Sequence, residues 1–305
     1  MITRHSRGSS VWVDLESPTY DELDSVMQEF GIDPRVEEEI VTPTPYPLTL
    51  ASPDYLYLIL HFPTSDPSGG TRDQEVDFIV GKNFLITARY EVIDSIHTLH
   101  RVFEAEELVG SHGEGGKTAT LLELVLRRLY GAIREEMEQV ARNLERIEHD
   151  IFAGRERRTV RTISETARVL LRFETILARH EEPLDTFLDE LAQPEFFGRG
   201  FRDNAAQIVA EHDHVAALVS SYRDVAHELR ITNDSLLTAS QNEIVKALTA
   251  MAFFLAPPTL LASLFGMNVT NIPFTEHPHA FWIILCLIFA VTGIFYLVFR
   301  IKKWL

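Results

Sequence analysis

Hydrophobic and polar residues follow three different patterns along the chain. In residues 1–115, short runs of β-branched and aromatic residues alternate with turn-forming residues, which predicts a mixed α/β domain. In residues 116–200, apolar positions recur at intervals of three and four, which predicts a helical hairpin. From 201 no glycine or proline interrupts the helical pattern before Pro257. We therefore expect one helix of about 65 residues, ~100 Å long at about 1.5 Å per residue.

Turn-forming residues delimit the elements expected in the first domain. Ser17-Pro18 is expected to begin a helix that Gly31 ends, and Gly81-Lys82-Asn83 is expected to connect a hairpin. Proline-rich and glycine-rich stretches predict loops at 43–47, 66–70 and 110–116, and Pro183 is expected to interrupt the helical hairpin region. The predicted strands are 11–15, 55–60, 76–80 and 84–88, and the predicted helices are 18–30 and 92–108.

Two long uncharged stretches lie near the C-terminus, Ala247–Met267 and Ala280–Phe299. Each has about the 20 apolar residues that a helix needs to cross a membrane. The segment 268–279 between them carries no lysine or arginine, whereas a basic tail, 300–305, follows the second span. In membrane proteins, lysine and arginine are enriched in the segments that face the cytoplasm. The chain is therefore predicted to be a multi-pass protein of the cell (inner) membrane, with both termini in the cytoplasm and 268–279 outside.

Charge and composition exclude several classes of protein. The chain has 305 residues, with 45 acidic and 28 basic side chains and a net charge of −17. A nucleic-acid-binding protein needs clustered basic residues, so no nucleic-acid partner is expected. A disulfide framework is excluded because Cys286 is the single cysteine. The apolar fraction of 46% is ample for a folded core.

Motifs that suggest catalysis or metal binding are incomplete. Gly115-Gly116-Lys117-Thr118 lacks the glycine at 111 that a phosphate-binding loop requires. His212, Asp213 and His214 are adjacent on a predicted helix, where neighbouring side chains point in different directions. A solvated patch on an acidic helix is the favoured interpretation of these three residues. No arrangement of nucleophile and base or of paired carboxylates stands out, so we expect no enzyme.

The first uncharged span carries polar and small residues that a simple lipid anchor does not need. They form two neighbouring lines with a spacing of seven residues, on one side of a helix. Close helix packing and a narrow wetted pore both explain such a stripe. A pore would require an oligomer, because two spans per chain cannot enclose one. The two lines are Asn242, Thr249, Ala256, Ser263 and Val245, Ala252, Thr259.

Gly266-Met267-Asn268 follows this span and resembles the signature of the CorA family of divalent-cation channels. The resemblance extends over about 240–305 and includes the second span and the basic tail. The remaining chain is consistent with the family in its order of elements: an α+β cytoplasmic domain, a long stalk helix (201–267) and two transmembrane helices, the second at 280–299. The matching positions are Asn242-Glu243-x-x-Lys246-x-Leu248-Thr249, Pro257, Thr259 and Phe265-Gly266-Met267-Asn268.

The resemblance implies a funnel-shaped homopentamer in the lipid bilayer, with Mg²⁺ (and Co²⁺) as substrate and no resident cofactor. Gly266, Met267 and Asn268 would form the selectivity filter, where Asn268 accepts hydrogen bonds from waters that Mg²⁺ releases reluctantly. Thr259 would add a second polar ring, and Glu276 would attract cations to the mouth. The implied pore-lining residues are Asn242, Val245, Leu248, Thr249, Ala252, Ala256 and Thr259.

The family also binds its ion on the cytoplasmic side, where Mg²⁺ holds the channel closed. Asp203 resembles the acidic ligand of the stalk in its local sequence, and Glu211 and Asp213 compete with it for this role. The segment 268–279 departs from magnesium members in its Ile-Pro element and its two histidines, His277 and His279. The Ile-Pro element and the Phe-Trp entry to the second span resemble the ZntB zinc-transporting branch, and the two histidines would suit zinc, so a proton-coupled Zn²⁺ transporter is the alternative.

Overall fold

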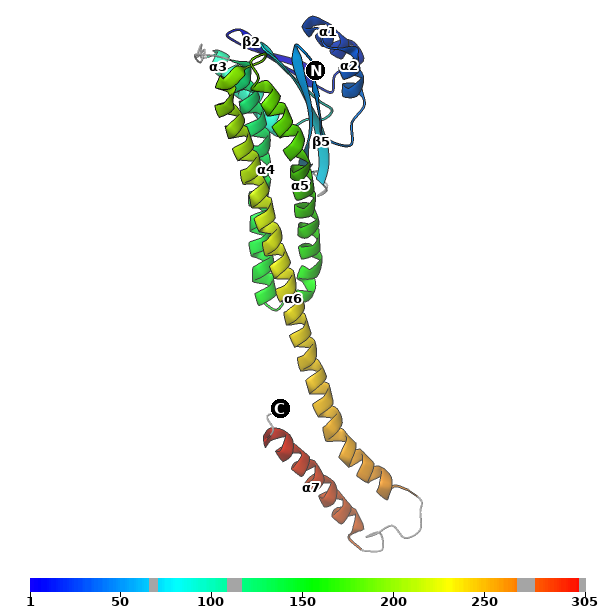
Figure 1. The fold of residues 1–305 in the computed structure, drawn as a ribbon. Coiled ribbons are helices and arrows are strands. Elements are labelled where there is room, and N and C mark those ends of the chain that lie inside the picture. Colours follow the sequence, from blue (N-terminus) through cyan, green and yellow to red (C-terminus); the bar gives the residue numbers. More distant parts are fainter. Residues whose placement is uncertain (66–70, 109–116, 268–277, 302–305) are drawn as a thin grey trace. The chain divides into compact units, whose positions relative to one another are not determined.

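The structure is a computed structural model that describes residues 1–65, 71–108, 117–267 and 278–301 (Figure 1). The loops predicted at 66–70 and 110–116 lie outside these residues. The strands are β1 (Ile2–Arg7), β2 (Ser10–Glu16), β3 (Leu48–Ala51), β4 (Tyr55–Ser65), β5 (Thr71–Gly81) and β6 (Phe84–Arg89). The helices are α1 (Tyr20–Phe30), α2 (Pro34–Val41), α3 (Asp94–Leu108), α4 (Thr118–Phe152), α5 (Glu156–Leu191), α6 (Arg202–Phe265) and α7 (Ala280–Ile301), with a short 3₁₀ helix at Gly198–Phe201.

The ends of α1 show how local chemistry fixes an element. Thr19, not Ser17-Pro18, is the N-cap, because its side chain accepts from the backbone N–H of Glu22 while Glu22 accepts from Thr19. The predicted start was therefore two residues early. Gly31 ends the helix as predicted, with φ of 66° in the left-handed region. The helix α2, with Asp33 as N-cap and Pro34 at its first turn, was not predicted.

Six strands form one mixed sheet in the order β1-β2-β6-β5-β4-β3. The hairpin predicted around Gly81-Lys82-Asn83 is present as the antiparallel pair β5–β6, in which Ile79 opposes Ile86. β2 and β6 are parallel. The edge strands β1 and β3 were not predicted, since β1 is polar and β3 has only four residues.

Helices cover both faces of the sheet. α1 and α2 pack on one face, where Val26, Met27 and Ile40 meet Ile59 and Ile86 in a buried cluster. α4 and α5 contact the strands, and Figure 1 shows them with α3 on the other side from α1 and α2. Because both faces are covered, β4 is a nearly continuous buried run from Tyr55 to Leu60.

A buried network of charged residues connects β2, β6 and α3. Arg89 Nη2 lies 2.9 Å from Asp14 Oδ2 and 2.6 Å from Glu16, and His100 Nε2 lies 2.8 Å from Asp14 Oδ2. Burial opposes ionisation of Asp14, but hydrogen bonds from His100, Arg89 and Thr87 together with the charge of Arg89 outweigh it. The pKa of Asp14 is therefore below its ordinary value.

A second buried carboxyl, that of Asp77 on β5, has a pKa that is shifted in the direction opposite to that of Asp14. Its side chain is 1% exposed and receives a 2.6 Å hydrogen bond from the Tyr57 hydroxyl. Burial raises the pKa of Asp77 well above its ordinary value, and the neighbouring carboxylates of Glu75 and Glu39 add to the rise. Burial therefore favours the protonated form of Asp77, whose Oδ1 accepts from Tyr57.

α4, α5 and the first part of α6 lie side by side (Figure 1). α5 continues through Pro183, contrary to the predicted interruption, and the carbonyl of Pro183 accepts a hydrogen bond from Thr49 of β3. α6 spans 64 residues, close to the expected length. In this part of α6 Ala226 is buried, whereas the neighbouring Val225 is exposed.

His212 is buried in the α6 interface, which corrects the prediction of a solvated patch for this residue, whereas Asp213 and His214 are exposed as predicted. Its Nε2 lies 3.0 Å from the carbonyl oxygen of Leu177. Nearby, burial lowers the pKa of His180 to about 3, so its imidazole is neutral. His180 Nε2 donates to the carbonyl of His61 at 2.9 Å, and its Nδ1 accepts from the Tyr130 hydroxyl at 3.1 Å. Hydrogen bonds therefore occupy these ring nitrogens.

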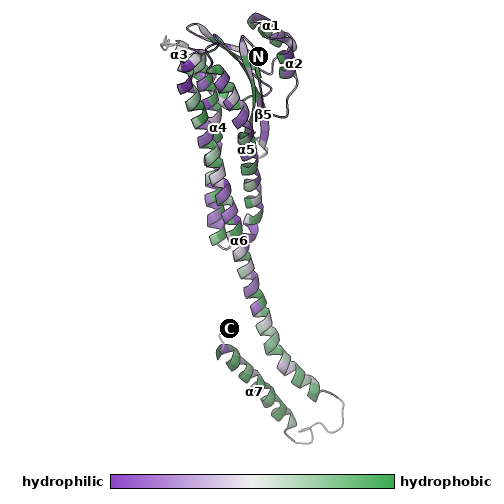
Figure 2. Ribbon diagram, in the orientation of Figure 1, coloured by the Kyte–Doolittle hydropathy of each residue, from purple (hydrophilic) through white to green (hydrophobic). Residues whose placement is uncertain are grey.

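Contacts divide the chain into two compact units, Met1–Arg230 and Ile231–Leu305, and α6 contributes to both. The first unit contains the sheet and the helical layer. The second contains the C-terminal part of α6 together with α7. Figure 2 shows that apolar residues dominate the last turns of α6 and most of α7, whereas α4 and α5 alternate between polar and apolar positions.

Candidate functional site

α6 and α7 each contain a stretch that is long and apolar enough to cross a membrane. Only 6% of the stretch in α6 and none of that in α7 is buried within the chain, unlike the core helix of a soluble domain. Such surface is stable only against lipid or another apolar surface. The two helices therefore match the two predicted spans.

The membrane part of α6 has two distinct faces. One face packs on α7, where the Phe254 ring lies 5.5 Å from Phe299 and 6.2 Å from Tyr296, centroid to centroid. The partly or fully covered positions recur every three or four residues along this face. They are Ala250, Phe254, Pro257, Pro258, Leu261 and Phe265.

The residues predicted to line a pore lie on the other face of α6. All are exposed in the single chain, and at 3.6 residues per turn they are centred about 180° from Phe254. This face carries amide, hydroxyl and small side chains together with Val245 and Leu248, which are 59% and 61% exposed. The structure thus brings together on one exposed face Asn242, Val245, Leu248, Thr249, Ala252, Ala256 and Thr259.

The two threonines on this face hold their hydroxyls in a defined orientation. Thr249 Oγ1 donates to the carbonyl of Val245 at 2.7 Å, and Thr259 Oγ1 donates to the carbonyl of Leu255 at 2.7 Å. The hydroxyl proton is therefore used within the helix. The free lone pairs of each oxygen can accept a hydrogen bond from water or from a hydrated cation.

Pro257 and Pro258 lie on the face of α6 that is turned toward α7. A proline cannot donate to the carbonyl four residues earlier, so the carbonyls of Phe253 and Phe254 lose their helical donors. The helix nevertheless continues to Phe265. Phe253 and Phe254 both contact Phe299 through their rings, which covers this weakened turn.

α6 ends where the predicted filter begins. The backbone N–H of Gly266 donates to the carbonyl of Ala262 at 3.0 Å, and a Cβ at 266 would lie only 3.1 Å from that oxygen. Glycine therefore fits this position without crowding the last helical turn. Met267 is 51% exposed. Asn268 and Glu276, the other predicted residues of this region, lie outside the described residues, as does His277.

The three acidic residues considered for cytoplasmic ion binding have different surroundings. Asp203 is exposed in the first turn of α6. Glu211 is paired with Arg134 of α4 at 2.7 Å. The Asp213 side chain is 68% exposed and contacts His212 Nδ1 at 3.1 Å. Within the described part of the chain, no three His, Cys, Asp or Glu side chains are arranged to hold a metal ion.

Ion pairs join the first part of α6 to α4 and α5, the two helices of the hairpin. Besides Arg134–Glu211, Arg223 of α6 pairs with Glu174 of α5 at 2.5 Å. These pairs join residues that are 77 and 49 positions apart in sequence. Helical periodicity cannot reveal such partners, because it describes one helix at a time.

Comparison with known proteins agrees with this arrangement. The family model described as "CorA-like Mg2+ transporter protein" matches residues 7–303. The "Cobalt/magnesium transport protein CorA" of Methanocaldococcus jannaschii is 23% identical over 97% of this chain and 91% of that protein.

Two solved structures show how far the likeness of fold extends. The complete structure of the CorA magnesium transporter from Methanocaldococcus jannaschii superposes with a TM-score of 0.83 at 21% identity, covering 97% of this chain and 92% of the other. The ZntB cytoplasmic domain from Vibrio parahaemolyticus gives a TM-score of 0.59 at 10% identity, covering 79% of this chain and 98% of that domain. The α/β domain, the long helix and the C-terminal helix thus match a full-length relative. Since the family model spans nearly the whole sequence, the chain belongs to the CorA-like Mg²⁺ transporter family.

Proposed function

We propose that the chain is the protomer of a homopentameric channel that admits divalent cations, Mg²⁺ and Co²⁺ first, into the cytoplasm. The observation that carries this proposal is the division of α6 into two faces. One face packs aromatic and proline residues on α7, while the other leaves hydroxyl, amide and small side chains exposed. Copies assembled around that second face would enclose a narrow path lined by polar and small groups.

Within this path, the predicted filter selects the hydrated ion. Mg²⁺ gives up its waters reluctantly, so neutral acceptors that bind those waters suit it better than carboxylates that would retain the ion. The amide oxygen of Asn268 is such an acceptor, and Thr259 offers a hydroxyl oxygen whose proton is already donated to Leu255. Val245 and Leu248 provide an apolar constriction, and Glu276 raises the concentration of cations at the outer mouth.

Orientation and regulation complete the proposal. The basic residues of the segment 300–305 support an orientation with both termini in the cytoplasm and Glu276 outside, because positive charge is enriched on cytoplasmic segments. Cytoplasmic Mg²⁺ would then bridge acidic residues of neighbouring protomers and keep the pore closed. Asp203 and Asp213 suit this role better than Glu211, because both are exposed whereas Glu211 is engaged by Arg134.

Ion uptake into liposomes that contain the purified full chain tests the function. We expect Mg²⁺ and Co²⁺ entry that follows voltage and concentration and does not change with a proton gradient. Asn268→Ala should abolish entry while the oligomer elutes unchanged, and Asn271→Ala, the same change three residues away, should retain it. Zn²⁺ entry that rises with the proton gradient would replace this proposal with the proton-coupled zinc transporter. Full Mg²⁺ entry in Asn268→Ala would remove the filter assignment.

A further inference from the structure

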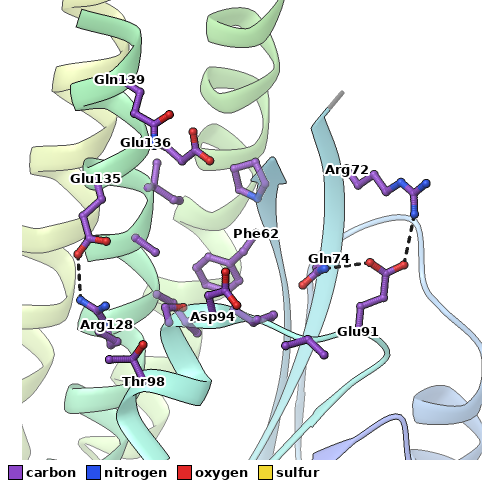
Figure 3. Close-up of a pocket in the computed structure, with 17 residues that line it drawn as sticks. Phe62, Arg72, Gln74, Glu91, Asp94, Thr98, Arg128, Glu135, Glu136 and Gln139 are labelled. Carbon is purple, nitrogen blue, oxygen red and sulfur yellow. Dashed lines mark hydrogen bonds and ion pairs between the residues drawn. The ribbon is translucent and has the colours of Figure 1, made fainter. Parts of the chain in front are cut away.

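A cavity of about 630 Å³ lies in the first unit, far along the chain from the membrane helices. Its walls come from β4, β5, the segment between β6 and α3, the beginning of α3, and the middle of α4 (Figure 3). This volume is in the range of about 300–1,000 Å³ that is typical of small-molecule sites. The lining includes three buried apolar side chains, Phe62, Leu129 and Ile133.

The charges that line this cavity leave two carboxylates unmatched. Arg128 pairs with Glu135 at 3.0 Å, and Arg72 lies 3.6 Å from Glu91. In the view of Figure 3 these two pairs flank the cavity, and Glu136, Phe62 and Asp94 lie between them. Among the described residues, neither Asp94 nor Glu136 has an ion-pair partner. The lining therefore carries two carboxylates in excess of its guanidinium groups.

Buried polar atoms in the lining also lack hydrogen-bond partners. Ser95 is 5% exposed, and its hydroxyl oxygen has none. The side-chain oxygen of Gln74 is buried and unpartnered too, although its amide nitrogen donates to Glu91 at 3.0 Å. An unpaired buried polar atom costs about 1–3 kcal/mol. Both oxygens line a cavity, where a ligand that carries N–H donors would satisfy them.

We propose that this cavity binds an organic polyamine, an aliphatic chain with two or more ammonium groups. The ammonium groups pair with Asp94 and Glu136 and donate hydrogen bonds to the oxygens of Ser95 and Gln74. The methylene groups between them cover Phe62, Leu129 and Ile133, and an ammonium over the Phe62 ring gains a cation–π attraction.

Two other ligand classes fit the same lining less well. The beginning of α3 carries roughly half a positive charge, which favours an anion, but Asp94 in that first turn already offsets it. An anion would also face four carboxylates and only two guanidinium groups, both of which already form ion pairs, although the buried Nε of Arg128 has no hydrogen-bond partner. A bare metal ion lacks a ligand set, since the described residues include no group of three suitable side chains.

This inference stands apart from the proposed function, since every lining residue belongs to the unit Met1–Arg230. Calorimetric binding of spermidine to the detergent-purified full chain, in excess Mg²⁺ and with no transport measured, tests it. Because the chain has a net charge of −17, its acidic surface attracts any polyvalent cation. The excess Mg²⁺ occupies these surface sites, so that they do not contribute to the measured spermidine binding. We expect saturable binding, with one spermidine per protomer.

Neutral isosteric substitutions identify the site. Asp94→Asn and Glu136→Gln should each weaken spermidine binding about tenfold or more, because each removes a charge-assisted hydrogen bond. Ser95→Ala should weaken it about two- to tenfold. Glu138→Gln removes the same charge from an exposed position of α4 outside the cavity, and should leave the affinity unchanged. Circular dichroism shows whether each variant is folded.

Several results would overturn the proposal. The first is a calorimetric titration with spermidine that shows no saturable binding. The second is a spermidine affinity that is the same in the cavity variants as in the wild type. The third is a loss of affinity in Glu138→Gln as large as in the cavity variants, which would indicate diffuse binding to the acidic surface. Binding of inorganic phosphate that weakens in Arg128→Gln would instead assign the cavity to an anion. None of these outcomes depends on ion flux, so failure here leaves the channel proposal untouched, and loss of flux leaves this one untouched.

Discussion

The hydroxyl of Thr259 donates a 2.7 Å hydrogen bond to the carbonyl oxygen of Leu255, one helical turn earlier on α6. Thr259 is exposed on the face of α6 that is turned away from α7. With its proton engaged, the hydroxyl can act toward the exterior only as an acceptor. A ring of such oxygens suits a cation whose surrounding waters donate.

Substitution of Thr259 tests this acceptor. Thr259→Val keeps the shape but removes the oxygen, and one net hydrogen bond of about 0.5–1.5 kcal/mol corresponds to a factor of about 2–10 in rate. We expect Mg²⁺ uptake into liposomes to fall by at least this factor, and Thr259→Ser to retain it. Thr292 on α7 makes the same bond to Ile288 at 2.7 Å, so Thr292→Val is the matched control. Equal losses in the two valine variants would refute a role for Thr259 in conduction.

Gly266 is expected to tolerate no side chain. A Cβ at this position would lie 3.1 Å from the carbonyl oxygen of Ala262, which is backbone and cannot move away without distorting the last turn of α6. Gly266→Ala should therefore displace the following filter residues and reduce Mg²⁺ uptake by at least about tenfold, equivalent to roughly 1.4 kcal/mol in the barrier. Gly293→Ala on α7 meets no atom within 4 Å and should transport normally. Normal uptake by Gly266→Ala would show that the turn adapts.

The buried pair Asp14–Arg89 is expected to be a major determinant of stability. Both side chains are 1% exposed, so Arg89→Met leaves the buried Asp14 carboxylate without its guanidinium partner, with only the hydrogen bonds from Thr87 and His100, and should lower the free energy of unfolding by about 3–5 kcal/mol. Arg4→Met, which breaks the half-exposed pair with Glu29, should cost at most about 1 kcal/mol. Thermal melting in detergent measures both. Similar losses of unfolding free energy in the two variants would mean that the buried Asp14–Arg89 pair contributes no more to stability than an exposed pair.

The same network predicts how stability responds to acid. The folded pKa of Asp14 is below its ordinary value of 3.8, so its contribution is complete above that value and is lost as the pH falls through the folded pKa. Wild-type protein should therefore lose more stability below pH 3.8 than Asp14→Asn, which has no proton to bind there. Parallel stability curves for the two proteins in acid would contradict this.

Local signals in the sequence were enough to predict most elements of the fold. Gly81-Lys82-Asn83 identifies the β5–β6 hairpin, and the uninterrupted pattern after 201 identifies α6. Pro183 misled the prediction, because tertiary contacts, including the bond from Thr49, hold α5 together around it. His212 misled it too, since its burial depends on α5, which approaches only in the folded chain.

In the candidate site, too, local patterns in the sequence predict some features, whereas others depend on contacts that form only in the folded chain. Seven-residue spacing predicts which residues share a face of α6, and the structure places Thr249, Ala256 and Thr259 together on an exposed face. The pairs Arg134–Glu211 and Asp14–Arg89 could not be predicted, because their members are 77 and 75 positions apart and no local pattern links them. The lining of the cavity beside α3 is likewise assembled from four distant segments, which only the folded chain brings together.

Asp77 should respond to pH in the direction opposite to Asp14. Burial raises the folded pKa of Asp77, so the folded chain binds the extra proton and stability falls as the pH rises from 3.8 through the raised value. Asp77→Asn avoids this loss. By thermal melting it should be more stable than wild type above that window, with the difference shrinking toward pH 3.8. Tyr57→Phe removes the hydrogen bond that favours the carboxylate and should extend the window to higher pH. An Asp77→Asn variant that is less stable than wild type at neutral pH would show that Asp77 is ionised and paired.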